Sequence, residues 1–192
     1  MAFLKTFTAR YLLSSIPLFL TLAGFGVTKL LPPLSYVKKI PVLLMLVVLL
    51  PLPLYFDFLL LTSPDKAPLP KAERAGYFEA WTAGYGFPDI AKFLLEKNKS
   101  QKVALGTEGF FGTLPDGIYI YLDKSNISVI GSHATISAQI RNAAKDHLTF
   151  FVGNKNNIEG SVDNVKLVLE YPKAKPKDNS KQDSVVLYQV LP

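Results

Sequence analysis

Three glycines that follow a short apolar run are the first residues whose spacing could do chemistry. Gly106, Gly109 and Gly112 lie in the segment GTEGFFG, where a phosphate-binding loop would follow a strand. The spacing matches neither the dinucleotide-binding pattern nor the Walker pattern, and no Lys-Ser/Thr pair follows. Glycines at a strand-to-helix turn usually serve backbone geometry, and that interpretation is favoured here over nucleotide binding.

The other polar side chains form no recognisable catalytic or metal-binding set. His133 and His147 are separated by an expected helix, and neither has a ligand partner at metal spacing. Glu79, Glu108 and Asp116 are possible acids, although a solvated surface carboxylate is the commoner role. We therefore expect no metal and no cofactor, and the sequence identifies no catalytic residue.

Charge and composition exclude some classes of function. The chain has 192 residues and a net charge of +6, of which the residues up to Ser63 carry +4. A nucleic-acid-binding protein would carry its basic excess on the soluble domain, so this function is not expected. Because there is no cysteine, disulfides, thiolate metal sites and cysteine nucleophiles are excluded.

Two long apolar runs in the first third predict a membrane region over residues 1–63. Residues 11–31 and 40–61 each give about twenty residues, enough to cross a hydrocarbon core of ~30 Å. Pro51 and Pro53 interrupt the second run, so neighbouring helices must satisfy the freed backbone groups. Asp57 near its end can reach the interface or serve a function at membrane depth. A cleaved signal peptide for the first run, or a buried helix hairpin of a soluble protein, is the alternative.

The positive charges give only a weak indication of orientation. Lys29, Lys38 and Lys39 lie in or beside the short connection, which would be cytoplasmic and leave both termini outside, although basic residues also flank the outer ends of both runs. The glycosylation sequons at Asn98 and Asn126 have meaning only if the host glycosylates this face.

The proline-rich stretch 63–71 predicts an extended exit from the membrane region. We expect a linker over residues 64–75 and an α/β domain over residues 76–192. Short apolar runs alternate with helical periodicity, as in βαβ units, and predict a small three-layer, mainly parallel, Rossmann-like sheet domain. The expected strands are 103–105, 127–130 and 148–152, and the expected helices begin near Pro88, Thr113 and Thr135. Two final runs, 165–171 and 185–190, predict an antiparallel hairpin with a long, mobile polar loop.

Several short motifs, taken in order, resemble the C-terminal end of bacterial GT-C class membrane glycosyltransferases, relatives of the protein O-mannosyltransferases and of the lipid A aminoarabinose transferase. The resemblance covers nearly the whole chain. The motifs are Arg10-Tyr11-Leu12-Leu13 with Pro17, Tyr77-Phe78-Glu79-Ala80-Trp81 running into Gly84-Tyr85-Gly86, Gly106-Thr107-Glu108-Gly109 with Gly112 and Leu114-Pro115, and Leu187-Tyr188-Gln189-Val190.

The resemblance implies transfer of a sugar from a polyprenyl-phosphate carrier at the outer face of the cytoplasmic membrane. It places Arg10 and Tyr11 near the carrier-binding cavity, where a guanidinium could bind the carrier's phosphate. Such enzymes have many more membrane helices and a catalytic acid in an early external loop, both missing here. The resemblance therefore implies a C-terminal portion, inactive alone, that partners the bilayer and further transmembrane helices. The alternative is a free-standing, membrane-anchored α/β module that binds or assembles without catalysis.

Overall fold

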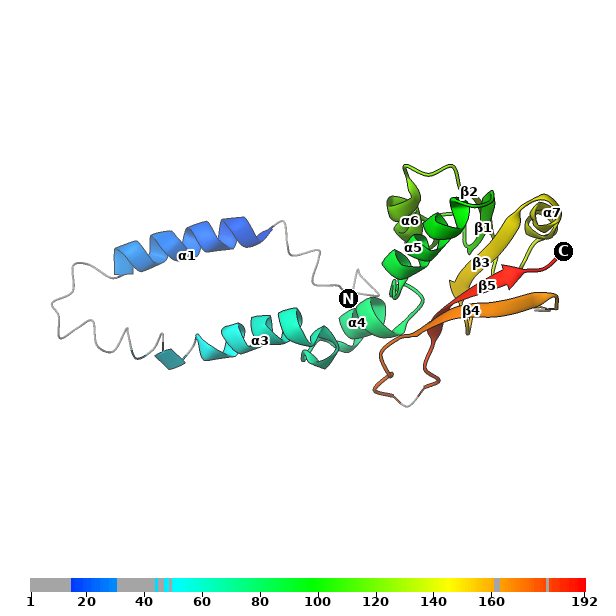
Figure 1. Cartoon of the computed structure of the whole chain (residues 1–192). Helices are drawn as coiled ribbons and strands as arrows, with labels where there is room; N and C mark the ends of the chain where they lie inside the picture. Colours follow the sequence, from blue (N-terminus) through cyan, green and yellow to red (C-terminus); the bar gives the residue numbers. More distant parts are fainter. Residues whose placement is uncertain (1–14, 31–43, 45–46, 49, 161–162, 179) are drawn as a thin grey trace, which may run out of the picture. The chain divides into compact units, whose positions relative to one another are not determined.

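The chain divides into two units, Met1–Glu73 and Arg74–Pro192. The computed structural model describes residues 15–30, 44, 47–48, 50–160, 163–178 and 180–192 (Figure 1). Within these ranges, no helix combines the length and the apolar character needed to span a bilayer. The two expected membrane segments, 11–31 and 40–61, lie partly outside the described residues.

Two apolar helices belong to the first unit. Helix α1 covers Ile16–Leu30 and helix α3 covers Pro51–Thr62. Pro51 and Pro53 lie in the first turn of α3, where the missing N–H groups would have no intrahelical partner, so the helix begins there instead of being broken. At 12 residues, α3 is about 18 Å long.

The expected extended linker is partly helical. A 3-10 turn, η2, covers Pro64–Lys66, and the short helix α4 covers Lys71–Arg74. A π-helical turn, η3, follows directly over Ala75–Glu79. Of residues 64–75, only the stretch between η2 and α4 lacks helical structure.

The second unit is built on one five-stranded sheet in the order β2-β1-β3-β5-β4. Strands β1 (Val103–Glu108), β2 (Ser128–Ser132) and β3 (Leu148–Asn154) are parallel. Strand β5 (Ser184–Val190) pairs antiparallel with both β3 and β4 (Val165–Pro172). The expected hairpin is confirmed, and it joins the sheet through its second strand.

Helices cover both faces of the sheet. Helices α5 (Phe87–Asn98) and α6 (Thr113–Leu122) lie on one face, and α7 (Ala138–Asp146) lies on the other (Figure 1). The β1-α6-β2 crossover moves one way across the sheet and β2-α7-β3 moves the other way, so right-handed connections place α6 and α7 on opposite faces. The three-layer α/β prediction is confirmed for this unit.

Each face has its own apolar core, because successive side chains of a strand point to opposite faces. Phe150 and Val152 of β3 pack under α5 and α6, whereas Phe151 packs against Ile140 of α7. Gly106 of β1 lies beneath Ile140, where an added Cβ would collide with the isoleucine. A glycine at this position therefore allows α7 to approach the sheet closely.

The expected element types were correct and some boundaries were not. Strand β1 continues to Glu108, so Gly106 and Thr107 belong to the strand and not to the loop that follows it. Helix α6 begins at the expected residue, but Thr113 does not cap it; instead the Asp116 carboxylate accepts a hydrogen bond of 2.7 Å from the Gly112 N–H.

The backbone of Gly86 should be intolerant of any side chain. Its φ of +73° lies in the left-handed region, and an added Cβ would collide with the Tyr171 ring. We expect Gly86→Ala to lower the free energy of unfolding by about 1–3 kcal/mol, from backbone strain plus the displaced ring. The measurement is denaturant unfolding of the whole chain, followed by the emission of Trp81.

Gly76→Ala is the matched control. A Cβ at Gly76 would make only an ordinary contact of 3.8 Å with the Thr82 hydroxyl, and its φ is not positive. This variant should be neutral or slightly stabilising. If both variants lowered the free energy of unfolding equally, backbone strain at Gly86 would not be the cause of the destabilisation.

Candidate functional site

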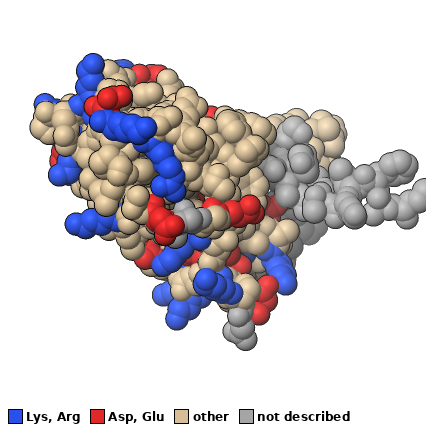
Figure 2. All heavy atoms as spheres, turned by 90° about the vertical axis from the view of Figure 1, so that its right-hand side faces the viewer, with Lys and Arg blue, Asp and Glu red and all other residues tan. Residues whose placement is uncertain are grey.

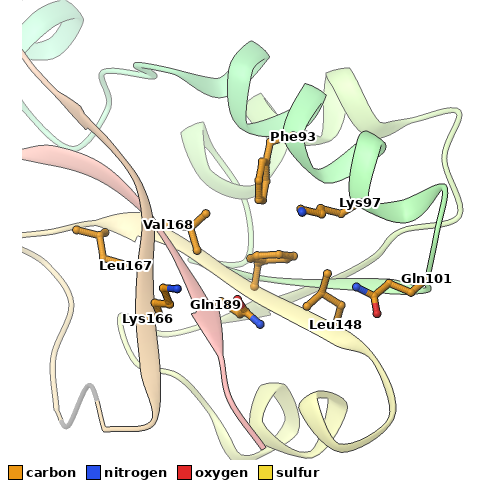
Figure 3. A pocket seen from close by; sticks show the side chains of 9 residues that line it. Phe93, Lys97, Gln101, Leu148, Lys166, Leu167, Val168 and Gln189 are labelled. Carbon is orange, nitrogen blue, oxygen red and sulfur yellow. The ribbon is translucent and has the colours of Figure 1, made fainter.

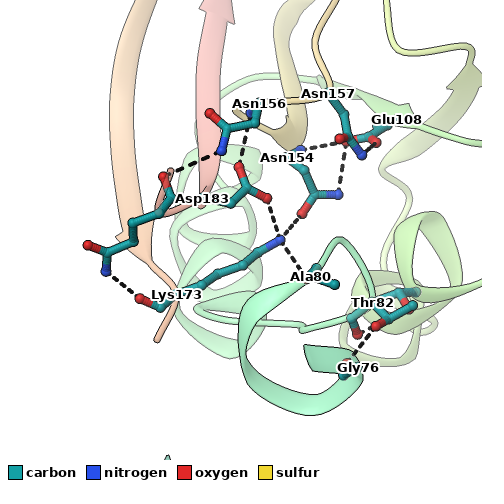
Figure 4. Close-up of polar contacts among 11 residues, drawn as sticks. Gly76, Ala80, Thr82, Glu108, Asn154, Asn156, Asn157, Lys173 and Asp183 are labelled. Atoms are coloured by element: carbon teal, nitrogen blue, oxygen red, sulfur yellow. Dashed lines mark hydrogen bonds and ion pairs between the residues drawn. The ribbon is translucent and has the colours of Figure 1, made fainter. Parts of the chain in front are cut away.

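The candidate site lies where the parallel strands end. The neighbouring strands β1 and β3 end at Glu108 and Asn154. After β1 the chain continues to β2 at one edge of the sheet, whereas after β3 it continues to β4 at the opposite edge. Such a switch point at the carboxyl ends of parallel strands is where open α/β sheets bind ligands. Here a cluster of polar side chains occupies it (Figure 4).

The Lys173 ammonium is the centre of this cluster. Its side chain is completely buried, and Nζ lies 2.7 Å from Asp183 Oδ2. Nζ also donates to the backbone oxygen of Ala80 at 3.0 Å and to Asn154 Oδ1. An ammonium has three donors, and all three are used. The charge is therefore both paired and fully hydrogen-bonded, which is what a buried lysine requires.

The register of the β4–β5 hairpin brings the two charges together. Pro172 pairs with Ser184, and the next residues inward, Lys173 and Asp183, continue the ladder through a backbone hydrogen bond of 3.0 Å. Asp183 is held from its other side, because its Oδ1 accepts the N–H of Asn156 at 3.0 Å. The carboxylate therefore bridges the hairpin and the turn after β3.

Glu108 completes the cluster from the end of β1. Its Oε2 accepts hydrogen bonds from the Asn154 backbone N–H at 2.5 Å and from Asn154 Nδ2 at 3.0 Å. Its Oε1 accepts one from Asn157 Nδ2 at 2.8 Å. The Asn154 amide thus donates to a carboxylate and accepts from the Lys173 ammonium, so the two charges fix its orientation.

The cluster also holds the segment that precedes helix α5. Besides the bond from Lys173 to Ala80, the Ala174 N–H donates to the Phe78 oxygen at 3.0 Å. The η3 turn is closed by the Thr82 hydroxyl, which donates to the Gly76 oxygen at 2.5 Å (Figure 4). Chemically, this arrangement is a clamp that joins the hairpin loop, the end of β3 and residues 76–82. Its charged groups are hydrogen-bonded to one another and to neighbouring amides.

A second ion pair lies on the surface beside the clamp. Lys155 Nζ is 2.9 Å from Glu170 Oε1. The hydrogen bond from Lys155, followed by one from Ser184, holds the pKa of Glu170 below its usual value. The same bond to Glu170 raises the pKa of Lys155. Both side chains are well exposed, so solvent screening leaves this pair only a small contribution to stability.

The residues singled out from the sequence are scattered. Arg10 and Tyr11 lie outside the described residues. Asp57 has an exposed side chain in α3. His133 packs its ring edge-on against Phe110 at 5.1 Å between centroids. Among the residues that the structure describes, no group of histidines and carboxylates could hold a metal ion.

The possible acids and the sequons have structural roles. Glu79 lies 2.6 Å from the Arg74 guanidinium, and Glu108 belongs to the clamp. The two sequon asparagines contact each other, with Asn98 Nδ2 donating to Asn126 Oδ1 at 2.5 Å. Of all the candidates, only Glu108 was found in the cluster, and not in a solvated surface role.

The glycines of the GTEGFFG segment also have structural roles. Gly106 makes room for α7, while Gly109 and Gly112 have φ values of +81° and +93°. Both turn glycines adopt conformations that other residues rarely reach. The interpretation as backbone geometry is therefore supported at all three positions.

No sequence pattern predicted that Lys173 would be buried. Lys173 and Asp183 lie at the two ends of PKAKPKDNSKQD, which was expected to be a solvated loop. The one indication in the sequence was that Lys173 closely follows the first β-rich run of the hairpin and Asp183 closely precedes the second, so the two residues are expected to face each other. Nothing local predicts that residues about 90 positions earlier cover them.

No known protein family, curated protein or solved structure matches the chain.

Lys173→Met should be strongly destabilising. The variant leaves the Asp183 carboxylate and the Asn154 oxygen without their donor, and breaking a buried pair in this way costs about 3–5 kcal/mol. Adding Asp183→Leu should recover part of the loss, because the uncompensated charge is removed. Denaturant unfolding of the whole chain, followed by Trp81 emission, gives both values. A loss below about 1 kcal/mol, typical of an exposed pair, would contradict the clamp.

Proposed function

We propose that the chain is the C-terminal membrane and soluble portion of a polyprenyl-phosphate-sugar-dependent glycosyltransferase, with no transferase activity of its own. The ordered motifs that resemble the GT-C class support the family. The segment Tyr77-Phe78-Glu79-Ala80-Trp81 is one of them, and the Lys173 clamp holds it against the α/β domain.

The observation that carries the proposal is the exposure of helix α3. None of its residues is buried, and Leu52 and Leu61 are 76% and 87% exposed. Helix α1 is similar, with Phe19 and Leu20 exposed at 64% and 68%. A helix that is apolar on all sides is stable only where lipid or other apolar helices surround it.

These helices favour a place in the cytoplasmic membrane among further transmembrane helices. Lysines in the short connection favour a cytoplasmic loop and an α/β domain on the extracytoplasmic side. In this arrangement Arg10 and Tyr11 contact the polyprenyl-phosphate carrier. Catalysis belongs to a part of the transferase outside this chain, because the charged groups at the carboxyl edge of the sheet are committed to the clamp.

The test is flotation combined with an activity assay. Reconstituted with phospholipid, the whole chain should float with vesicles and resist extraction by alkaline carbonate, because its apolar helices are inserted. Supplied with a polyprenyl-phosphate sugar and an acceptor extract, it should transfer no sugar. Co-expression with the upstream reading frame is the matched comparison. Sugar transfer by the chain alone would overturn the proposal, and loss of the chain into the carbonate supernatant would overturn the membrane assignment.

A groove beside α5 favours the alternative of a membrane-anchored binding module. It has a volume of about 490 Å³ and is lined by Phe93, Lys97, Gln101, Leu148, Phe150, Lys166, Leu167, Val168 and Gln189 (Figure 3). Phe93 and Phe150 stack edge-to-face at 5.5 Å and form an apolar wall. Two lysines and no carboxylate line the groove, so its charge complements an anionic ligand with an apolar body.

The alternative predicts binding of a small amphipathic anion. Phenyl phosphate should shift the backbone amide resonances of α5 and β4, and Lys97→Gln with Lys166→Gln should weaken binding about tenfold or more, because two charge-assisted contacts are lost. Lys124→Gln, an exposed lysine outside the groove, is the control. Unchanged resonances at millimolar phenyl phosphate would remove the support for a binding module.

A further inference from the structure

Four exposed aromatic side chains lie on two segments at the carboxyl edge of the sheet. Tyr77 and Trp81 are each 56% exposed, Phe110 is 58% exposed and Phe111 is 83% exposed. They come from two segments, the η3 region and the turn between β1 and α6. Together they are called the aromatic rim. Apolar side chains grouped in this way usually mark an interaction surface.

Hydrogen bonds hold the two segments side by side. The Thr113 hydroxyl, at the end of the β1–α6 turn, donates to the Thr82 oxygen at 3.3 Å. Gly109 and Gly112 flank the two phenylalanines, and their positive φ values form the turn. The two segments are therefore joined at the backbone, and each of the four aromatic side chains leaves more than half of its surface exposed.

A basic loop flanks the rim. The β4–β5 loop is tied to the Phe78 and Ala80 oxygens through Ala174 and Lys173. Farther along this loop, Lys175, Lys177 and Lys181 are exposed. In Figure 2, Lys or Arg side chains gather with a few acidic ones at the lower end of the molecule, where this loop lies. Exposed aromatic side chains beside lysines match the interface of an anionic bilayer, where aromatic rings lie at headgroup level.

We propose that the aromatic rim and the β4–β5 loop dock on the surface of a bilayer that contains anionic lipid. The inference rests on the proposed membrane anchoring and adds the orientation of the domain. Only the 14 residues 63–76 lie between Thr62 at the end of α3 and Tyr77, so the rim follows the proposed membrane anchor directly in the sequence. The 83% exposed side chain of Phe111 suits a soft lipid surface better than a rigid protein partner, which would need to present a matching pocket.

Docking in this way decides what each end of the sheet faces. The carboxyl edge, with Glu108 and Asn154, would face the headgroups. The groove beside α5 lies at the opposite edge, because Leu148 begins β3 and Lys166 lies next to the start of β4, which runs in the same direction. That groove would open away from the membrane, toward ligands in the aqueous compartment.

The chain contains its own reporter, because Trp81 is its only tryptophan. The whole chain is reconstituted into vesicles of phosphatidylcholine and phosphatidylglycerol, with and without bromine on the acyl chains. Docking predicts a blue-shifted emission that brominated lipid lowers by about half, because an interfacial tryptophan ring lies within reach of the acyl chains. Vesicles of phosphatidylcholine alone should give weaker quenching.

Variants test whether quenching of Trp81 depends on the aromatic rim and on the lysines of the β4–β5 loop. Phe110→Ser with Phe111→Ser, and separately Lys175→Gln with Lys177→Gln and Lys181→Gln, should each restore much of the Trp81 emission in brominated vesicles. Tyr121→Ser is the control, because Tyr121 is 49% exposed but lies at the far end of α6. Its quenching should equal that of the unaltered chain.

The outcomes are distinguishable. If the chain floats with vesicles but Trp81 is not quenched, docking is overturned and the proposed anchoring stands. If the chain does not float, the anchoring fails and the docking inference fails with it. Quenching that both rim and loop variants leave unchanged also overturns the docking surface.

Discussion

The buried ammonium of Lys173 is the constraint on which the arrangement of the second unit depends. A lysine removed from water needs an acceptor for each of its three donors, and these come from three different parts of the chain: Asp183, Asn154 and Ala80. Any structure that separated one of them would leave a buried charge incompletely bonded. The hairpin loop, the end of β3 and the segment before α5 are therefore positioned together.

This interaction also connects the fold to the proposed function. The residues held through Ala80 include Tyr77 and Trp81, which belong both to the resemblance and to the aromatic rim. A rim that moved freely could not orient the domain. Because the clamp occupies the switch point of the sheet, the place where many α/β domains bind ligands serves here to fix a surface.

The two units of the chain differ in how far their apolar side chains are buried. The second unit buries its apolar residues on both faces of the sheet, as a domain in water must. Helices α1 and α3 instead leave their apolar side chains exposed, with no buried residue in α3. This difference in exposure is the reason why the proposed function places the helices of the first unit in lipid.

The sequence by itself determined the element types of the second unit, because strand and helix periodicity are local properties. The runs at 148–152 and 185–190 predicted β3 and β5, and the hairpin was recognisable from its two β-rich runs. The insertion of β5 between β3 and β4, the burial of Lys173 and the position of Glu108 in the clamp were decided only by the tertiary structure. These features depend on contacts between residues far apart in the chain, such as Lys173 and Ala80, and no local pattern records which distant carbonyl will cover a charged side chain.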